Sequence, residues 1–201
     1  MDNPELLTGA GGLELDRLST PSDAANVDRR IRKTRQRLQA GLLLLMKEKP
    51  ISQITMREIC RRADVGRSTP YTHYRDVEDI LEQMENALYN DLSALLNQYP
   101  SSLNAGQEAW LTSAYSLAQR NGLLLEVLLC YDGDQAFMRR LLSLLQNGMK
   151  DSQSADIPYS NWRSTFLTGG INYIVQQWVS GGGAESPEEL ARLTISFLAS
   201  N

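Results

Sequence analysis

The sequence predicts an all-α protein of about nine helices, and three observations support this prediction. Apolar residues recur at spacings of three and four through most of the chain after residue 27, which is the period of amphipathic helices. No stretch alternates convincingly with the period of two that a half-buried strand would show. Turn-forming residues separate the helical patterns at short intervals. Hydrophobic residues make up 42% of the chain, which is enough for a packed core.

The chain begins with 27 residues that show no sustained period. They contain three glycines and two prolines, so we expect residues 1–27 to form a mostly disordered arm. The first strong helical pattern follows, with a very basic first half and a very apolar second half. The expected buried face of this helix carries Ile31, Thr34 or Arg35, Leu38, Leu42, Leu45 and Met46.

Two short helices are expected next. Thr55 stands three residues before Glu58, which is the spacing of a capping box that starts a helix. Gly66 can supply the sharp corner that closes this helix. The segment 67–74, "RSTPYTHY", is then expected to form a second short polar helix. Pro70 fits its first turn, where proline is tolerated. Together these features predict a helix-turn-helix arrangement.

Long helical patterns fill the rest of the chain. Asp76 is placed to cap the first of them. Asn121-Gly122, Asp132-Gly133 and the glycine run at 181–183 separate several of the others. The helices expected outside the segment 67–74 cover about residues 28–49, 56–62, 77–99, 103–120, 123–130, 134–150, 160–180 and 187–199.

The charges are divided very unevenly along the chain. The net charge is −4, which alone would disfavour a nucleic-acid binder. Residues 28–75, however, hold 13 of the 20 lysines and arginines and only four acids, so this segment carries +9 and the remainder −13. Such a division predicts a basic module that binds a polyanion and an acidic body with a different task.

Several other classes of protein are disfavoured. No apolar run approaches the roughly 18 residues of a membrane span, and the first residues do not resemble a signal peptide, so we expect a cytoplasmic protein without a membrane partner. Cys60 and Cys130 are expected to be small buried side chains rather than a redox pair. The single histidine, His73, has no partner at metal-ligand spacing, and enzyme motifs are absent, so we expect no metal, no cofactor and no catalytic site.

The segment 67–74 has the side chains that a DNA-reading element needs. Arginine can bond guanine or phosphate, hydroxyl groups can reach phosphates and base edges, and a threonine methyl can meet a thymine methyl. Of its two tyrosines, we expect Tyr71 to contact phosphate and Tyr74 to pack inside the small domain.

These residues resemble the tetracycline-repressor (TetR/AcrR) family of bacterial transcriptional regulators. The resemblance covers about residues 29–82 and includes the stretch "ITMREICRRADVGRSTPYTHYRDVEDIL". The positions that match the family pattern are Thr55, Ile59, Ala63, Val65, Ser68, Thr69, Tyr71, His73 and Tyr74. Two positions depart from it: Pro70 stands where the family usually has a large apolar residue, and Val77 stands where it often has lysine.

The resemblance implies a three-helix DNA-binding domain, placed at residues 28–75, and a larger helical ligand-binding and dimerisation domain, placed at residues 76–201. It also implies a homodimer that binds a palindromic double-stranded DNA operator and is released by an unidentified small-molecule effector. Because of Pro70 and Val77, an alternative stays open: a TetR-like protein with weakened or lost DNA binding that acts through protein partners.

Three sets of site residues follow from these patterns and from the resemblance. The residues expected to contact DNA are Arg35, Thr55, Arg57, Arg67, Ser68, Thr69, Tyr71, Thr72 and His73. The residues expected to line a ligand pocket are Trp110, Tyr115, Phe137, Met138, Leu141, Trp162 and Phe166. The residues expected at the dimer interface are Gly169, Gly170, Tyr173, Leu193 and Phe197.

Overall fold

The structure, a computed structural model, describes residues 21–100, 105–131, 134–151 and 160–199. The described residues form eight α-helices and two 3-10 helices joined by turns and loops, and none of them forms a strand. The predicted all-α class is therefore confirmed. The elements are α1 (Pro21–Met46), η1 (Ile51–Gln53), α2 (Met56–Ala63), η2 (Pro70–Thr72), α3 (Val77–Leu96), α4 (Ala105–Arg120), α5 (Gly122–Cys130), α6 (Gln135–Asp151), α7 (Ser160–Ser180) and α8 (Pro187–Ala199).

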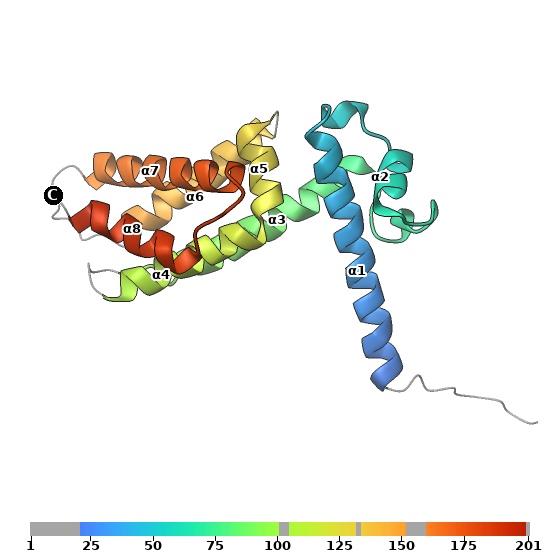
Figure 1. The fold of residues 1–201 in the computed structure, drawn as a ribbon, viewed down its shortest axis with the longest axis horizontal. Coiled ribbons are helices and arrows are strands. Elements are labelled where there is room, and N and C mark those ends of the chain that lie inside the picture. The colour runs from blue at the N-terminus through green and yellow to red at the C-terminus, as the bar shows by residue number, and fades with distance from the viewer. Residues whose placement is uncertain (1–20, 101–104, 132–133, 152–159, 200–201) are drawn as a thin grey trace, which may run out of the picture.

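The molecule has a small part and a larger part that share one long helix (Figure 1). The small part contains α1, α2 and η2, and the larger part is a bundle of α4 to α8. Helix α3 packs against α1 in the small part and against α4 and α6 in the bundle. A change in the bundle can therefore reach the small part through a continuous helix.

Helix α1 begins earlier than the sequence pattern indicates. It starts at Pro21, so seven residues of the expected arm are helical, and residues 1–20 lie outside the described part of the chain. Proline is well suited to a first helical position, which explains the start. Ile31, expected on the buried face, is 39% exposed. The reason is visible in Figure 1, where the first half of α1 extends beyond its neighbours.

Helix α2 is fixed at its start by the expected capping box. The Thr55 hydroxyl accepts a hydrogen bond from the Glu58 N–H (3.3 Å), and the Glu58 carboxylate accepts one from the Thr55 N–H (3.0 Å). Gly41 of α1 lets α2 approach closely, because a Cβ atom there would meet the Ile59 carbonyl oxygen at 3.3 Å. Helix α2 is thereby held tightly against α1.

The corner after α2 is made differently from the prediction. Asp64, not Gly66, adopts the left-handed backbone conformation, with φ of 51°. The Val65 N–H donates to the Cys60 carbonyl (3.0 Å), which closes the helix end. Arg37 of α1 donates to both the carbonyl and the carboxylate of Asp64, each at 2.9 Å, and so supports this conformation from outside the helix.

Candidate nucleic-acid interface and ligand cavity

The segment expected to be a recognition helix is a series of tight turns. Thr69 N–H donates to the Gly66 carbonyl (3.1 Å), and η2 then spans only Pro70–Thr72. The His73 and Tyr74 N–H groups both donate to the Pro70 carbonyl at 2.9 Å. The His73 bond reaches back three residues, so residues 70–72 form a 3-10 turn that does not continue into an α-helix.

Two buried rings anchor this segment to the small part. Pro70 is among the fully buried side chains, and Tyr74 is 3% exposed, as expected for a packing residue. Pro70 therefore occupies the core position that the family usually gives to a larger apolar residue. Arg35 of α1 donates to the Tyr74 hydroxyl (3.4 Å) and to Gln83 of α3 (2.8 Å), and its guanidinium lies 5.7 Å from the Tyr74 ring centroid. Arg35 thus ties α1 to α3.

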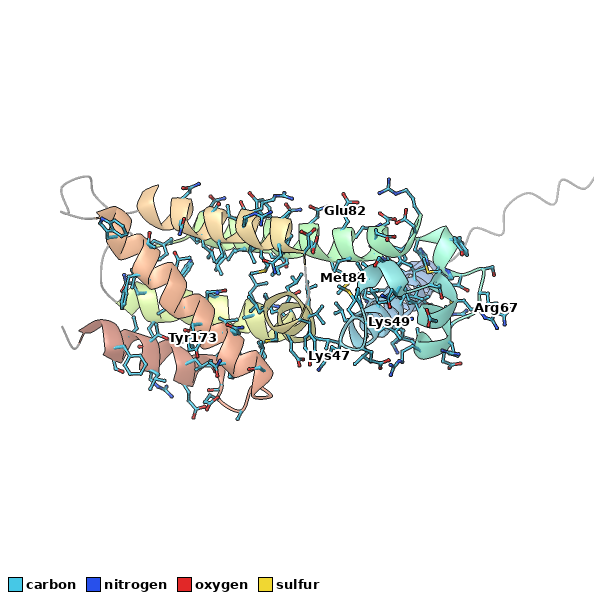
Figure 2. All side chains as sticks on the ribbon, turned by 90° about the horizontal axis from the view of Figure 1, so that it is seen from above. Lys47, Lys49, Arg67, Glu82, Met84 and Tyr173 are labelled. Atoms are coloured by element: carbon cyan, nitrogen blue, oxygen red, sulfur yellow. The ribbon has the colours of Figure 1, made fainter. Side chains whose placement is uncertain are left out.

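The other side chains of the segment point outward. Tyr71 is 64% exposed, and Arg67, Ser68 and Thr72 are also exposed. Thr69 and His73 are half-buried. The Thr72 hydroxyl donates to the Thr69 carbonyl (2.7 Å). Figure 2 shows Arg67 at the outer tip of the small part, at the end of the molecule opposite Tyr173. We call the exposed residues Arg67, Ser68, Tyr71 and Thr72 the tip surface.

Basic side chains of α2 lie close to the tip surface in the sequence and are exposed. Arg57 and Arg61 have no ion-pair partner in the described part of the chain, whereas Arg62 pairs with Glu48. Lys49 Nζ lies 2.7 Å from Glu58 Oε1. Hydrogen bonds from Lys49 and from the Thr55 backbone lower the pKa of Glu58 to about 2, so this carboxylate is ionised and its negative charge is balanced by Lys49. Helix α2 keeps a net basic outer face.

Two predicted contact residues have other partners. The Thr55 hydroxyl takes part in the capping box and lies 2.9 Å from the Glu58 carboxylate, so its first role is structural. Arg35 bonds Tyr74 and Gln83, as described above. Val77, the position where the family often has lysine, is 7% exposed at the start of α3. A lysine side chain there would have to leave the core to reach a phosphate.

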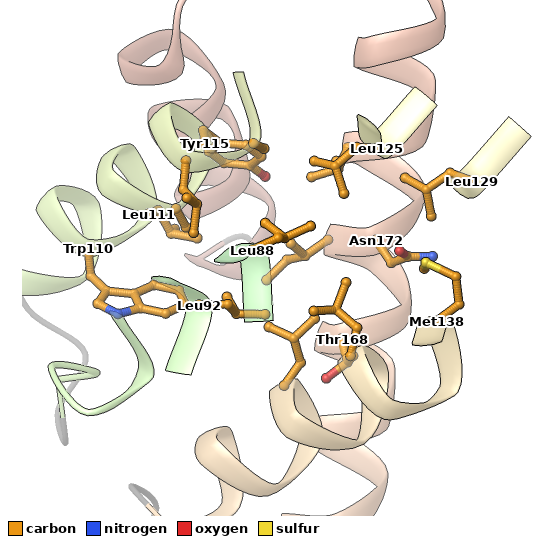
Figure 3. A pocket seen from close by; sticks show the side chains of 17 residues that line it. Leu88, Leu92, Trp110, Leu111, Tyr115, Leu125, Leu129, Met138, Thr168 and Asn172 are labelled. Carbon is orange, nitrogen blue, oxygen red and sulfur yellow. The ribbon is translucent and has the colours of Figure 1, made fainter. Parts of the chain in front are cut away.

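A cavity of about 100 Å³ lies between α3, α4, α5, α6 and α7 and is partly open to solvent (Figure 3). Of the predicted pocket residues, Trp110, Tyr115, Met138 and Leu141 line it. Its other lining residues, not singled out in the sequence, are Leu88, Leu92, Leu111, Ala114, Leu117, Ala118, Leu125, Leu129, Leu145, Thr168, Ile171, Asn172 and Val175. Helical spacing alone could have suggested only that some of these residues face inward.

Three predicted pocket residues do not line the cavity. Phe137 is buried beside it, at 5% exposure. Trp162 and Phe166 are 74% and 73% exposed, so their placement in a pocket is corrected. Both lie on α7, whose opposite face supplies Thr168, Asn172 and other lining residues. Apolar residues occur on both faces of α7, so the sequence did not show which face lines the cavity.

Two aromatic side chains connect the cavity to neighbouring elements. The hydroxyl groups of Tyr115 and Thr194 of α8 lie 2.7 Å apart and are hydrogen-bonded, and the Tyr115 ring meets the Trp178 ring edge-on at 6.1 Å. Burial raises the pKa of Tyr115, so its phenol stays neutral. Trp110 Nε1 donates to the Leu95 carbonyl at 2.9 Å. The polar atoms of both rings are therefore already hydrogen-bonded.

An uncovered apolar face runs along α7 and α8, and we call it the α7–α8 face. It holds the large side chains that are most exposed in the bundle, and Cβ atoms added at its two glycines would meet no neighbour within 4 Å. Its members are Trp162, Phe166, Gly169, Gly170, Tyr173, Leu193 and Phe197. The expected dimer residues all lie here, together with the two aromatics expected in the pocket.

An ion pair joins the two parts. Lys47, just after α1, lies 2.7 Å from Glu126 of α5, and both side chains are at least two-thirds buried. Its Nζ atom is also 5.7 Å from the Tyr131 ring centroid. The bond to Glu126 raises the pKa of Lys47. Figure 2 places Lys47 near the middle of the molecule. Glu126 lies next to Leu125, which lines the cavity.

Other features add little chemistry. Cys60 is buried as expected, whereas Cys130 is exposed at the end of α5, contrary to the expectation. Within the described ranges, no group of His, Cys, Asp and Glu side chains could hold a metal ion. Among the helices described, none is long and apolar enough to cross a membrane.

Comparison with known proteins gives two matches in sequence. Residues 107–200 match the family model TetR_C_8, a transcriptional regulator C-terminal region. A stretch of 55 residues, 25% of this chain, is 38% identical to the uncharacterized HTH-type transcriptional regulator YxbF of Bacillus subtilis (strain 168). The match spans 14% of the length of that curated relative.

Solved structures share the fold over most of both chains. A TetR transcriptional regulator from Streptococcus agalactiae 2603V has a TM-score of 0.51 and 24% identity, and the match covers 87% of this chain and 98% of that one. A TetR-family structure from Syntrophomonas wolfei has a TM-score of 0.59 and 19% identity, with 83% and 93% covered. FadR from Bacillus subtilis, solved with stearoyl-CoA, has a TM-score of 0.54 and 14% identity, with 81% and 96% covered.

Proposed function

We propose that this chain is a TetR-family transcriptional regulator, a homodimeric repressor that binds a palindromic operator and is released by a small molecule. The matches to transcriptional regulators support a DNA-binding regulator rather than an enzyme. The observation that carries the proposal is the tip surface. Its exposed arginine, hydroxyl and phenol groups are held outward by two buried rings, Pro70 and Tyr74.

The tip surface is suited to a DNA groove by its chemistry and by its surroundings. Arg67 and the hydroxyl groups of Ser68, Tyr71 and Thr72 can bond base edges and phosphates. Arg57 and Arg61 of α2 can neutralise flanking phosphates, because no acid pairs with them in the described part of the chain. The turn geometry keeps these side chains on the outside even though no full α-helix forms.

The α7–α8 face supports the proposed dimer. Isolated apolar side chains are common on protein surfaces, but five large exposed ones on two helices of the bundle indicate an interaction site. The same face on a second copy would cover it with matching aromatic side chains, as in an isologous two-fold interface. A dimer of this kind presents two tip surfaces, which is what a palindromic operator requires.

The cavity supports the proposed effector response. It is apolar and lies between helices, which is typical of small-molecule sites. The FadR relative shows that a chain of this fold can be solved with a bound ligand, stearoyl-CoA. A ligand that favours one arrangement of α3 and α5 would shift the small parts of the dimer relative to each other.

Selection from a pool of random DNA duplexes at moderate salt tests this function. We expect recovery of one palindromic motif whose affinity falls steeply as salt rises. Recovery of no preferred sequence by a well-folded dimer would overturn DNA recognition. That result would favour the alternative, a regulator that acts through protein partners, for which the shortened turn at Pro70 is the supporting observation.

A further inference from the structure

The cavity has an unusual balance of chemistry that restricts what it can bind. Fourteen of its seventeen lining residues are apolar, and none is charged. The polar ones are Tyr115, Thr168 and Asn172. A charged ligand in such a site would lose its hydration without gaining a counter-charge, which is costly. The lining therefore favours an uncharged molecule.

The three polar residues differ in what they can offer to a ligand. The Tyr115 hydroxyl is hydrogen-bonded to Thr194 at 2.7 Å. Thr168 is 3% exposed and has an interaction of its own. Asn172 is half-buried, and its amide makes no hydrogen bond with any described residue. Figure 3 shows this amide on the α7 wall, beside Met138. A side-chain amide offers one acceptor oxygen and two donors.

The size of the cavity limits the ligand further. At about 100 Å³ it is somewhat smaller than an engineered apolar cavity of about 150 Å³ that binds benzene. The space therefore suits a molecule of at most about six non-hydrogen atoms, the size of benzene. A longer chain would extend out of the partly open cavity.

We propose that the cavity takes a small, uncharged, mostly apolar molecule with one hydroxyl, carbonyl or amide group, and that Asn172 is the residue that recognises this polar group. The proposal rests on the effector response described above, because it names the class of molecule that acts there. Specificity then comes from a single amide in an apolar wall, since a polar group of the ligand placed elsewhere would lose its hydrogen bonds.

Three probes of equal chain length test the ligand class directly: 1-pentanol, pentanoate and pentylammonium. Nuclear magnetic resonance titration of the full chain at neutral pH, without DNA, measures their affinities. We expect 1-pentanol to bind in the cavity and both charged probes to bind at least about tenfold more weakly. Equal or tighter binding of a charged probe, or no binding by 1-pentanol, overturns the proposal.

Two substitutions test the role of Asn172. Asn172→Leu should weaken 1-pentanol binding about fivefold, which corresponds to one lost hydrogen bond. Asn172→Asp should instead improve the binding of pentylammonium relative to 1-pentanol. Asn90→Leu, the same change at an exposed position of α3, should leave all affinities unchanged. Native-like 1-pentanol affinity in Asn172→Leu, or an unchanged probe preference in Asn172→Asp, overturns the assignment.

The experiment separates this proposal from the effector response on which it rests. Binding is measured without DNA, so the affinities of the probes test only the class of ligand and not the release of the operator. Addition of saturating 1-pentanol to the protein–operator complex then reports on release. Asn172-dependent binding without release would contradict the proposed effector response while the ligand class stands.

Discussion

Pro70 shows how one residue can change an element without removing its surface. Its ring is fully buried, and it begins the 3-10 turn of residues 70–72. Pro70→Ala removes two buried carbon atoms and the stiffness of the ring, so it should lower the free energy of unfolding by about 2 kcal/mol. Chemical denaturation measures this change.

The same variant distinguishes the two candidate functions. Arg67 and Tyr71 are already on the surface, so Pro70→Ala should alter operator affinity less than about threefold once the fold is maintained. A gain of tenfold or more, measured on the selected operator, would mean that the proline suppresses DNA binding. The alternative function would then be favoured.

Glu85 is a buried acid that makes stability depend on pH. Its Oε1 atom has no hydrogen-bond partner among the residues that the structure describes. Burial, and to a lesser extent Asp134 and Glu82, raise the pKa of Glu85 to about 7, while Arg140 opposes this shift. Because the ordinary pKa is 4.5, the folded chain holds a proton between about pH 4.5 and 7 that the unfolded chain releases. Stability from this group is therefore present at low pH and lost as the pH rises to 7.

Glu85→Gln should remove the loss of stability that ionisation of Glu85 causes as the pH rises. At about pH 8 the variant should be more stable than the native chain by up to about 3 kcal/mol, and near pH 4.5 the gain should vanish. Urea denaturation at the two pH values measures the difference. An equal effect of the substitution at both pH values would mean that Glu85 is not protonated by burial.

Structural features that depend on neighbouring residues could be predicted from the sequence, whereas those that depend on contacts between distant residues could not. The capping box of Thr55 and Glu58 depends on residues three apart, so the sequence pattern was enough. The left-handed residue was assigned to Gly66 because glycine adopts that conformation most easily. Asp64 takes it instead, with support from Arg37, which lies 27 residues away. No local pattern contains that contact.

At the level of elements, α5 is placed to link the cavity to the small part. Leu125 and Leu129 line the cavity, while Glu126 between them pairs with Lys47 after α1. Lys47→Met leaves a carboxylate without its partner in a mostly buried site, so it should lower the melting temperature. Adding Glu126→Gln should recover part of the loss. A purely additive double variant in a mutant cycle would show that the pair does not couple the two parts.

Helix α7 could be predicted from the sequence, but the residues with which it lines the cavity could not. Its bounds, residues 160–180, matched the expected helix, because the glycine run at 181–183 is a strong end signal. Its aromatics could not be sorted, because one face lines a cavity and the other lies on the molecular surface, and both carry apolar residues. Trp162 and Phe166 therefore seemed suitable for a pocket, although the residues of α7 that reach it are Thr168, Ile171, Asn172 and Val175.

At the level of the whole molecule, the α7–α8 face is proposed to hold two copies together. Phe166 is 73% exposed in the middle of that face. Phe166→Asp places a charge where the partner would exclude water, so the dimer should dissociate at micromolar concentration. Val27→Asp, at a 54% exposed position of α1, is the matched control and should leave the mass unchanged. Light scattering after gel filtration measures the molar mass. A Phe166→Asp variant that is still a dimer would exclude the α7–α8 face as the dimer interface.

The most direct test of the account is the affinity of Arg67→Ala for the selected operator, measured by fluorescence anisotropy at fixed salt. Arg67 is exposed at the outer tip of the molecule, and a dimer would present it twice. The account predicts at least a tenfold loss of affinity, with a normal dimer and a normal melting temperature. Arg192→Ala, an exposed arginine on α8, should bind like the native chain. Native affinity in Arg67→Ala would contradict the claim that the tip surface reads DNA.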